Sequence, residues 1–174
     1  MYTVTGFEIL EMLRDVPPFD VGAPMPILIS NDLDLVVSYY VSSGRGAITN
    51  DRIPIVMGEG NGDTQAIVRF RSYISVLFGM PNDEALNGHP LYSQGLSSYN
   101  AFQVHNSSWV HELERMNSVH SQHNPDHYAK QKHFIFTFHD VMFECVAESY
   151  SSTLYQNCSR ETVLADMSKV ILRN

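Results

Sequence analysis

The fold is decided by two adjacent stretches, HFIFTFH at residues 133–139 and MFECVAE at residues 142–148. Both are rich in aromatic and β-branched residues, and successive side chains of a strand point to opposite faces. A two-residue turn at Asp140-Val141 would pair Phe138 with Phe143, Phe136 with Cys145 and Phe134 with Ala147. The hairpin therefore predicts an aromatic core face. The opposite face would carry His133, Thr137, His139, Glu144 and Glu148.

The segments before this hairpin also predict strands. They are residues 27–29, 33–41, 53–57, 66–70, 73–80 and 101–105. The glycine run Gly58–Gly62 has strand patterns on both sides, whereas a phosphate-binding loop must open a helix. It therefore predicts a hairpin that joins the strand at 53–57 to the strand at 66–70. Ser43–Gly46 predicts a loop.

Four segments predict helices. Thr5 and Glu8 have capping-box spacing, and the apolar residues that follow predict a helix that ends at Pro17-Pro18. Helix-capping residues precede a helix at 107–119. The remaining helices are a short one from Pro125 to Lys130 and a C-terminal one at 160–172. In helix 107–119 the side chains expected to face the core are Trp109, Leu113 and Met116.

Together these elements predict an α+β fold in a single domain of 1–174. It would contain a curved antiparallel sheet of about six or seven strands, open or barrel-like, with helices packed on one face or at the ends. Residues 1–26 would form an N-terminal helix and a Pro-rich linker, and 27–150 the sheet core with helix 107–119. The C-terminal helix at 160–172 would close the domain.

The composition argues against some classes of partner and compartment. The net charge of −8 argues against nucleic-acid binding, which depends on clustered cations. Only two cysteines occur, so no disulfide framework is indicated and a reducing, cytoplasmic compartment fits best. The sequence has no apolar run of about 18 residues, the length that would span a membrane. We therefore expect a cytoplasmic protein without a membrane or nucleic-acid partner.

All eight histidines follow residue 88, in a segment that also contains acids, Asn and Ser. Two imidazoles and a carboxylate can form a catalytic zinc or iron site, and an Asp beside a His can orient its ring. His133 and His139 are six residues apart, about 20 Å along a straight strand, so only one of them could belong to such a site. The candidate ligand or metal-site residues are His89, His105, His139, Asp140 and Glu144.

Simpler roles compete with this hypothesis. His139 and Asp140 can form the polar turn of the hairpin, because Asp satisfies backbone amides in turns. His120, His123 and His127 fit a solvated loop. Neither a zinc-protease helix nor a G-x-S-x-G serine motif is present. On balance we predict no resident metal or cofactor.

Several segments resemble those of a bacterial family of conserved hypothetical proteins. They are GHPLY at 88–92, NSSW at 106–109, ELERMN at 112–117, HFIFTFHD at 133–140 and FECVAE at 143–148. The similarity extends more loosely to residues 27–40, so it covers most of the chain. It implies a bacterial, cytosolic single domain and brings no catalytic residue with it.

The resulting expectation is a cytosolic domain that binds a small molecule or a protein partner without catalysis. The alternative is a metal-dependent enzyme that uses His139, Glu144 and His89 or His105. A third possibility, suggested by the acidic charge, is an inhibitor of a basic protein partner.

Overall fold

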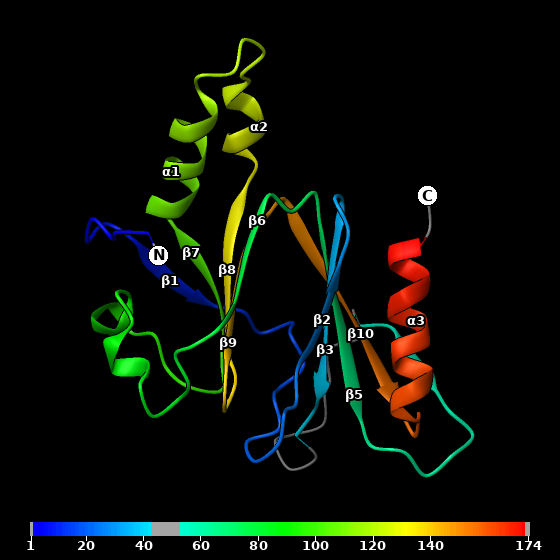
Figure 1. Ribbon diagram of the computed structural model, residues 1–174. Coiled ribbons are helices and arrows are strands. Elements are labelled where there is room, and N and C mark those ends of the chain that lie inside the picture. Colours follow the sequence, from blue (N-terminus) through cyan, green and yellow to red (C-terminus); the bar gives the residue numbers. More distant parts are fainter. Residues whose placement is uncertain (1, 43–52, 173–174) are drawn as a thin grey trace. The chain divides into compact units, whose positions relative to one another are not determined.

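The computed structural model describes residues 2–42 and 53–172, and it confirms the α+β class (Figure 1). The chain divides into two compact units, each with its own five-stranded sheet. One unit is built from residues 1–13 and 74–149, the other from residues 14–73 and 150–174. The expected single sheet is therefore wrong. In neither sheet do the two edge strands pair with each other, so among the described residues no barrel closes.

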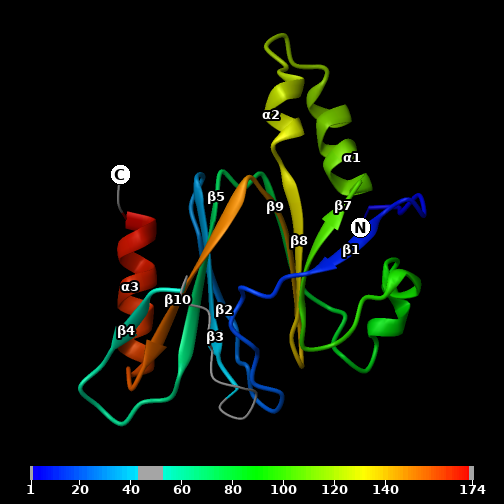
Figure 2. The same cartoon turned by 180° about the vertical axis from the view of Figure 1, so that it is seen from behind.

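The first unit contains an antiparallel sheet with the strand order β1-β7-β8-β9-β6. Its strands are β1 (Ile9–Met12), β7 (Ala101–His105), β8 (Lys132–Thr137), β9 (Met142–Ala147) and β6 (Ser75–Gly79). The helices α1 (Ser108–Asn117) and α2 (Pro125–Ala129) connect β7 to β8 and lie side by side (Figures 1 and 2). The single turns η1 (Leu86–Gly88) and η2 (Tyr92–Gln94) lie between β6 and β7 in the sequence.

The hairpin of β8 and β9 is present, but its predicted register is wrong by two residues. Phe136 lies opposite Phe143, and Phe134 lies opposite Cys145. The loop contains four residues rather than two, and the Phe138 N–H donates to the Val141 carbonyl at 3.0 Å. Because side chains alternate with a period of two, this shift keeps every residue on its predicted face.

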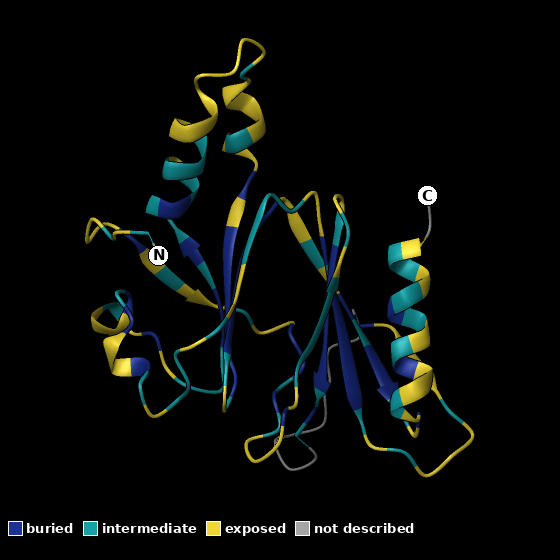
Figure 3. Cartoon of the chain, in the orientation of Figure 1, coloured by how far each residue is buried: buried dark blue, intermediate teal, exposed yellow. Residues whose placement is uncertain are grey.

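Both faces of this hairpin are buried (Figure 3). One face carries the phenylalanines, as predicted. The other places Ile135 opposite Glu144 and joins an apolar cluster with η1, η2 and β7. The buried members of that cluster are Leu86, Leu91, Leu96, Phe102, Val104, Ile135 and Met142. His133 and Glu144 are therefore on a covered face, beneath the segment that contains His89.

The predicted N-terminal helix is wrong. The Thr5 N–H does donate to the Glu8 carboxylate at 2.9 Å, as a capping box requires. However, Gly6 has a φ of +87°, and residues Ile9–Met12 form β1, which pairs with β7. Helical spacing of a few apolar residues is a weak preference, and pairing with an available sheet edge overrides it.

Of the helices in the β7–β8 connection, α2 begins at Pro125 as predicted, and α1 begins one residue after the predicted position 107. The Ser107 hydroxyl accepts the Val110 N–H at the start of α1, and the Asn124 side chain accepts the Asp126 N–H at the start of α2. Trp109 is buried as expected. Met116 is 51% exposed, so its predicted place in the core is wrong. The apolar contact of α1 is confined to its first turns.

The second unit contains a mixed sheet with the order β2-β3-β5-β10-β4. Its strands are β2 (Ile27–Ser30), β3 (Asp34–Tyr40), β5 (Gln65–Arg71), β10 (Ser149–Gln156) and β4 (Ile55–Met57). The predicted C-terminal helix is α3 (Arg160–Leu172). Its residues Val163 and Met167 are fully buried in a cluster with Val36 and Ile67 of the sheet.

The predicted hairpin at Gly58–Gly62 is wrong, because β4 pairs in parallel with β10 instead of pairing with β5. A side chain at Gly58 would put its Cβ 2.3 Å from the Asn157 carbonyl oxygen, and one at Gly62 would put it 2.2 Å from the Cys158 carbonyl oxygen. These glycines allow two backbones to pack closely. The predicted loop at 43–46 lies outside the described residues. Among the helices described, none has the length and apolar character needed to cross a membrane.

Candidate functional site

A buried carboxylate, Glu144 of β9, is the centre of a polar cluster in the first unit. Its side chain is only 2% exposed, and three donors surround it. His133 Nε2 lies 2.9 Å from Oε2, and His89 Nε2 lies 3.2 Å from Oε1. The Tyr2 hydroxyl donates to Oε2 at 2.7 Å. A charge this deeply buried is tolerated only when it is hydrogen-bonded in this way.

The second nitrogen of each imidazole determines where its proton lies. His89 Nδ1 accepts the Leu91 N–H at 3.2 Å, so the ring proton is on Nε2 and points at Glu144. His133 Nδ1 lies 2.9 Å from the Ser107 hydroxyl, which can donate to it. Both rings can therefore be neutral while each donates one Nε2–H to the carboxylate. This arrangement satisfies every polar atom of the cluster with one net negative charge.

The environment sets the protonation states at neutral pH. Burial alone raises the pKa of Glu144, but the hydrogen bonds from His133 and His89 outweigh it and lower the pKa to about 2. Burial lowers the pKa of His133, although Glu144 opposes that shift. Burial, followed by the charge of Glu144, raises the pKa of Tyr2. Glu144 is therefore ionised, His133 neutral and Tyr2 protonated.

Aromatic rings enclose His133. Tyr2 stacks on Trp109 with ring centroids 5.4 Å apart and an interplanar angle of 10°. His133 meets both rings edge to face, at 5.2 Å from Tyr2 and 5.1 Å from Trp109. The N-terminal segment and α1 therefore cover the polar cluster. Tyr2 connects this cluster to the surface.

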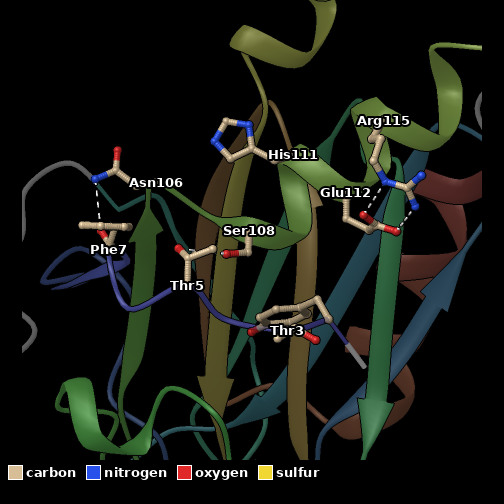
Figure 4. A pocket seen from close by; sticks show the side chains of 9 residues that line it. Thr3, Thr5, Phe7, Asn106, Ser108, His111, Glu112 and Arg115 are labelled. Carbon is tan, nitrogen blue, oxygen red and sulfur yellow. Dashed lines mark hydrogen bonds and ion pairs between the residues drawn. The ribbon is translucent and has the colours of Figure 1, made fainter.

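A cleft of about 580 Å³ lies between the N-terminal segment and α1 (Figure 4). Its lining residues are Tyr2, Thr3, Thr5, Phe7, Asn106, Ser108, His111, Glu112 and Arg115. The Asn106 amide donates to the Phe7 carbonyl at 3.2 Å. Arg115 donates from Nε and from Nη2 to Glu112, at 2.8 and 2.5 Å. The His111 ring has no hydrogen-bond or ion-pair partner among the described residues.

Glu8 lies next to this cleft and is also buried. Its carboxylate accepts the N–H groups of Thr5 and Gly6 and the Ser108 hydroxyl. Burial raises the pKa of Glu8, but the Ser108 hydroxyl and the backbone amides outweigh it and lower the pKa to about 2. The ionised Glu8 carboxylate therefore lies beside Ser108, the first residue of α1, where the helix dipole favours negative charge.

A second hollow, of about 260 Å³, also borders the start of α1. Ser107, Val110 and His111 line it from α1 and its cap, and Tyr128 and Gln131 line it from α2 and the residues that follow. Gln131 is 7% exposed, and its Oε1 atom is buried without a hydrogen-bond partner among the described residues. An unsatisfied buried acceptor of this kind costs stability.

His139 belongs to a separate cluster at the β8–β9 loop. Its Nδ1 lies 2.9 Å from Asp83 Oδ2, and the Tyr99 hydroxyl donates to the same carboxylate at 2.5 Å. These two hydrogen bonds lower the pKa of Asp83, and the Asp83 hydrogen bond raises the pKa of His139. Asp83, and not the neighbouring Asp140, therefore orients this ring.

Replacing Asp83 with Asn is expected to lower the pKa of His139 towards its ordinary value of about 6.5, because the anionic acceptor is lost. NMR titration of the His139 ring protons measures the change. Asp140→Asn is the control, since Asp140 acts on the ring only through its charge. An equal or larger drop in the Asp140→Asn variant would contradict the assignment.

Of the five residues proposed from the sequence, the structure brings only His89 and Glu144 together. His105 pairs with Glu11 at 2.7 Å on the exposed β1–β7 edge, His139 pairs with Asp83, and Asp140 is exposed. Within the described ranges no group of three His, Cys, Asp or Glu side chains is arranged to hold a metal.

Sequence reasoning missed Tyr2 and Ser107, and it placed His133 on the correct face without connecting it to Glu144. The strand alternation of the hairpin could have found that pair, because residues diagonally opposite on one face lie close together. His89 was among the candidates, but Tyr2 carries no comparable signal, since the fold brings it in from a distant position. No protein-family model, curated protein or solved structure matches this chain.

Proposed function

We propose that this protein binds a small polar molecule in the cleft between its N-terminal segment and α1. The observation that carries the proposal is the cleft itself, which at about 580 Å³ falls within the range of about 300–1,000 Å³ usual for small-molecule sites. Two elements distant in sequence meet there and present aromatic, hydroxyl, amide and imidazole groups to one space.

The lining favours an uncharged ligand. Glu112 and Arg115 neutralise each other through two hydrogen bonds, and the Glu8 carboxylate lies just beneath Ser108. A phosphate would meet this carboxylate without a free cation to hold it. Phe7, which is 77% exposed, offers an apolar ring face instead. A molecule with one apolar face and several hydrogen-bonding groups fits this combination.

We place this binding in the cytoplasm and expect no nucleic-acid partner. Cys145 and Cys158 are both free and buried, which fits a reducing compartment. The net charge of −8 opposes phosphate backbones, so a small molecule is the better partner.

A metabolite library tested by native mass spectrometry is expected to yield a ligand bound one to one. Phe7→Ala should then weaken its affinity about tenfold, which corresponds to about 1.4 kcal/mol, because the ring contact is lost. Titration calorimetry measures the change. Met116→Ala is the matched control, since Met116 is also an exposed apolar residue but lies outside the cleft lining. Unchanged affinity in both Phe7→Ala and His111→Ala would place the ligand elsewhere.

A further inference from the structure

Ser107, His133 and Glu144 are joined by an unbroken chain of hydrogen bonds. The Ser107 Oγ lies 2.9 Å from His133 Nδ1, and His133 Nε2 lies 2.9 Å from Glu144 Oε2. His133 is fully buried, and Glu144 is ionised. A hydroxyl, an imidazole and a carboxylate in this order are the three parts of a serine-nucleophile triad.

The proton positions match that role. Because the carboxylate holds the His133 proton on Nε2, the Nδ1 lone pair faces the Ser107 hydroxyl. A serine triad needs this tautomer, in which the ring nitrogen facing the acid carries the proton and the other nitrogen presents its lone pair to the serine. The two ring nitrogens have exchanged places relative to the usual triad, where the carboxylate binds Nδ1. In both arrangements the ring nitrogen that faces the carboxylate carries the proton.

The backbone around Ser107 also has the features of a nucleophile turn. Ser107 lies between the end of β7 and the start of α1, and Asn106 before it has a φ of +54°. A strained turn from a strand into a helix is the position of the serine in the G-x-S-x-G elbow. Ser107 differs from that serine in having an ordinary extended backbone, with φ −62° and ψ 118°, and the positive φ falls on Asn106, a residue type that tolerates it.

Ser107 also lines the hollow of about 260 Å³ beside α2. Gln131, whose Oε1 atom is buried without a hydrogen-bond partner among the described residues, lines the same hollow. The small volume limits the substrate to a short acyl group.

We propose that Ser107, His133 and Glu144 catalyse the hydrolysis of a small acyl ester in this hollow. Ser107 Oγ forms a bond to the ester carbonyl carbon and gives its proton to His133 Nδ1. The bond to the leaving alcohol then breaks, and the alcohol departs with that proton. Water attacks the acyl-serine by the reverse path and releases the carboxylic acid, so ester and water give acid and alcohol. Glu144 is a positioning residue that holds the imidazole and stabilises its cation.

The proposed triad does not depend on the binding function proposed for the cleft, although Asn106 and His111 line both hollows. The triad uses Ser107, whereas the cleft is lined by the neighbouring hydroxyl of Ser108, which donates to Glu8. Ser107→Ala should therefore leave ligand binding in the cleft unchanged.

The test is covalent labelling of the whole chain by diisopropyl fluorophosphate, in which Ser107 Oγ forms a bond to phosphorus and fluoride leaves. Intact-mass measurement is expected to show one adduct per folded chain, and peptide mapping should place it on Ser107. The urea-unfolded chain should give none. Ser121→Ala, at an exposed serine of the same unit, is the matched control and should label at the rate of the unchanged protein, while Ser107→Ala should not label.

Glu144→Gln tests the positioning role. Its labelling rate is expected to fall at least a hundredfold while the fluorescence of Trp109 shows that the unit remains folded. If Ser107→Ala or Glu144→Gln fails to fold, Ser107→Thr replaces it, because Thr also caps a helix and its added methyl hinders attack. Ser107→Thr should retain the fold and lose most of the labelling. Absence of an adduct on the folded protein, or an adduct on another serine, would overturn the proposal.

Discussion

Replacing Phe136 with Ala is expected to lower the free energy of unfolding by about 3–5 kcal/mol, the usual cost of truncating a buried aromatic residue. Phe136 is fully buried in β8 and lies directly opposite Phe143, with ring centroids 5.6 Å apart. The loss combines the transfer of the ring to water with the cavity left in a strand buried on both faces. Urea denaturation followed by Trp109 fluorescence measures it, because Trp109 lies in the same unit.

Val119→Ala is the control for this experiment. Val119 belongs to the same unit and is 91% exposed, so its truncation should change the free energy of unfolding by less than about 0.5 kcal/mol. A loss of under about 1 kcal/mol for Phe136→Ala would mean that the β8–β9 core face is assigned incorrectly.

Replacing Glu144 with Ala is expected to cost about 3–5 kcal/mol at pH 7, as when one partner of a buried ionic cluster is removed. The variant leaves the Nε2–H groups of His89 and His133 and the Tyr2 hydroxyl buried without their acceptor. Urea denaturation again measures the change. Glu148→Ala is the matched control, because Glu148 lies just after β9 and is exposed. Equal losses in the two variants would show that the cluster contributes nothing.

The same carboxylate predicts how stability changes with pH. The folded-state pKa of Glu144 is about 2, below its ordinary value of 4.5, so its contribution is complete above pH 4.5 and is lost as the pH falls towards 2. The pKa of His133 is also lowered, so below about pH 6.5 the unfolded chain gains a proton that the folded chain resists. Both effects destabilise the fold in acid.

Glu144→Gln separates these two contributions, because it removes the carboxylate and keeps its volume. The free energy of unfolding of the variant should fall less steeply than that of the unchanged protein between pH 4.5 and 2. Denaturation curves at several pH values measure both slopes. Identical slopes would mean that Glu144 does not titrate with the lowered pKa.

The sequence by itself determined the elements whose signals are local. The caps at Ser107 and Asn124 mark the starts of α1 and α2, and the alternation in residues 133–148 predicts the faces of the β8–β9 hairpin. Caps and alternation involve residues only a few positions apart, so they act before the chain has any tertiary contacts. For the same reason Phe134 and Phe136 could be assigned to a buried face in advance.

Only the tertiary structure decided which distant segments meet. Residues Ile9–Met12 form a strand because β7 offers a free edge, and β4 pairs with β10 because Gly58 and Gly62 let two backbones approach. The polar cluster around Glu144 also depends on contacts between distant segments. Glu144 and His133 share a hairpin face, but Tyr2 and His89 reach them from 142 and 55 residues away. Buried charge is stable only where the complete set of donors converges, and that convergence depends on the packing of the whole unit.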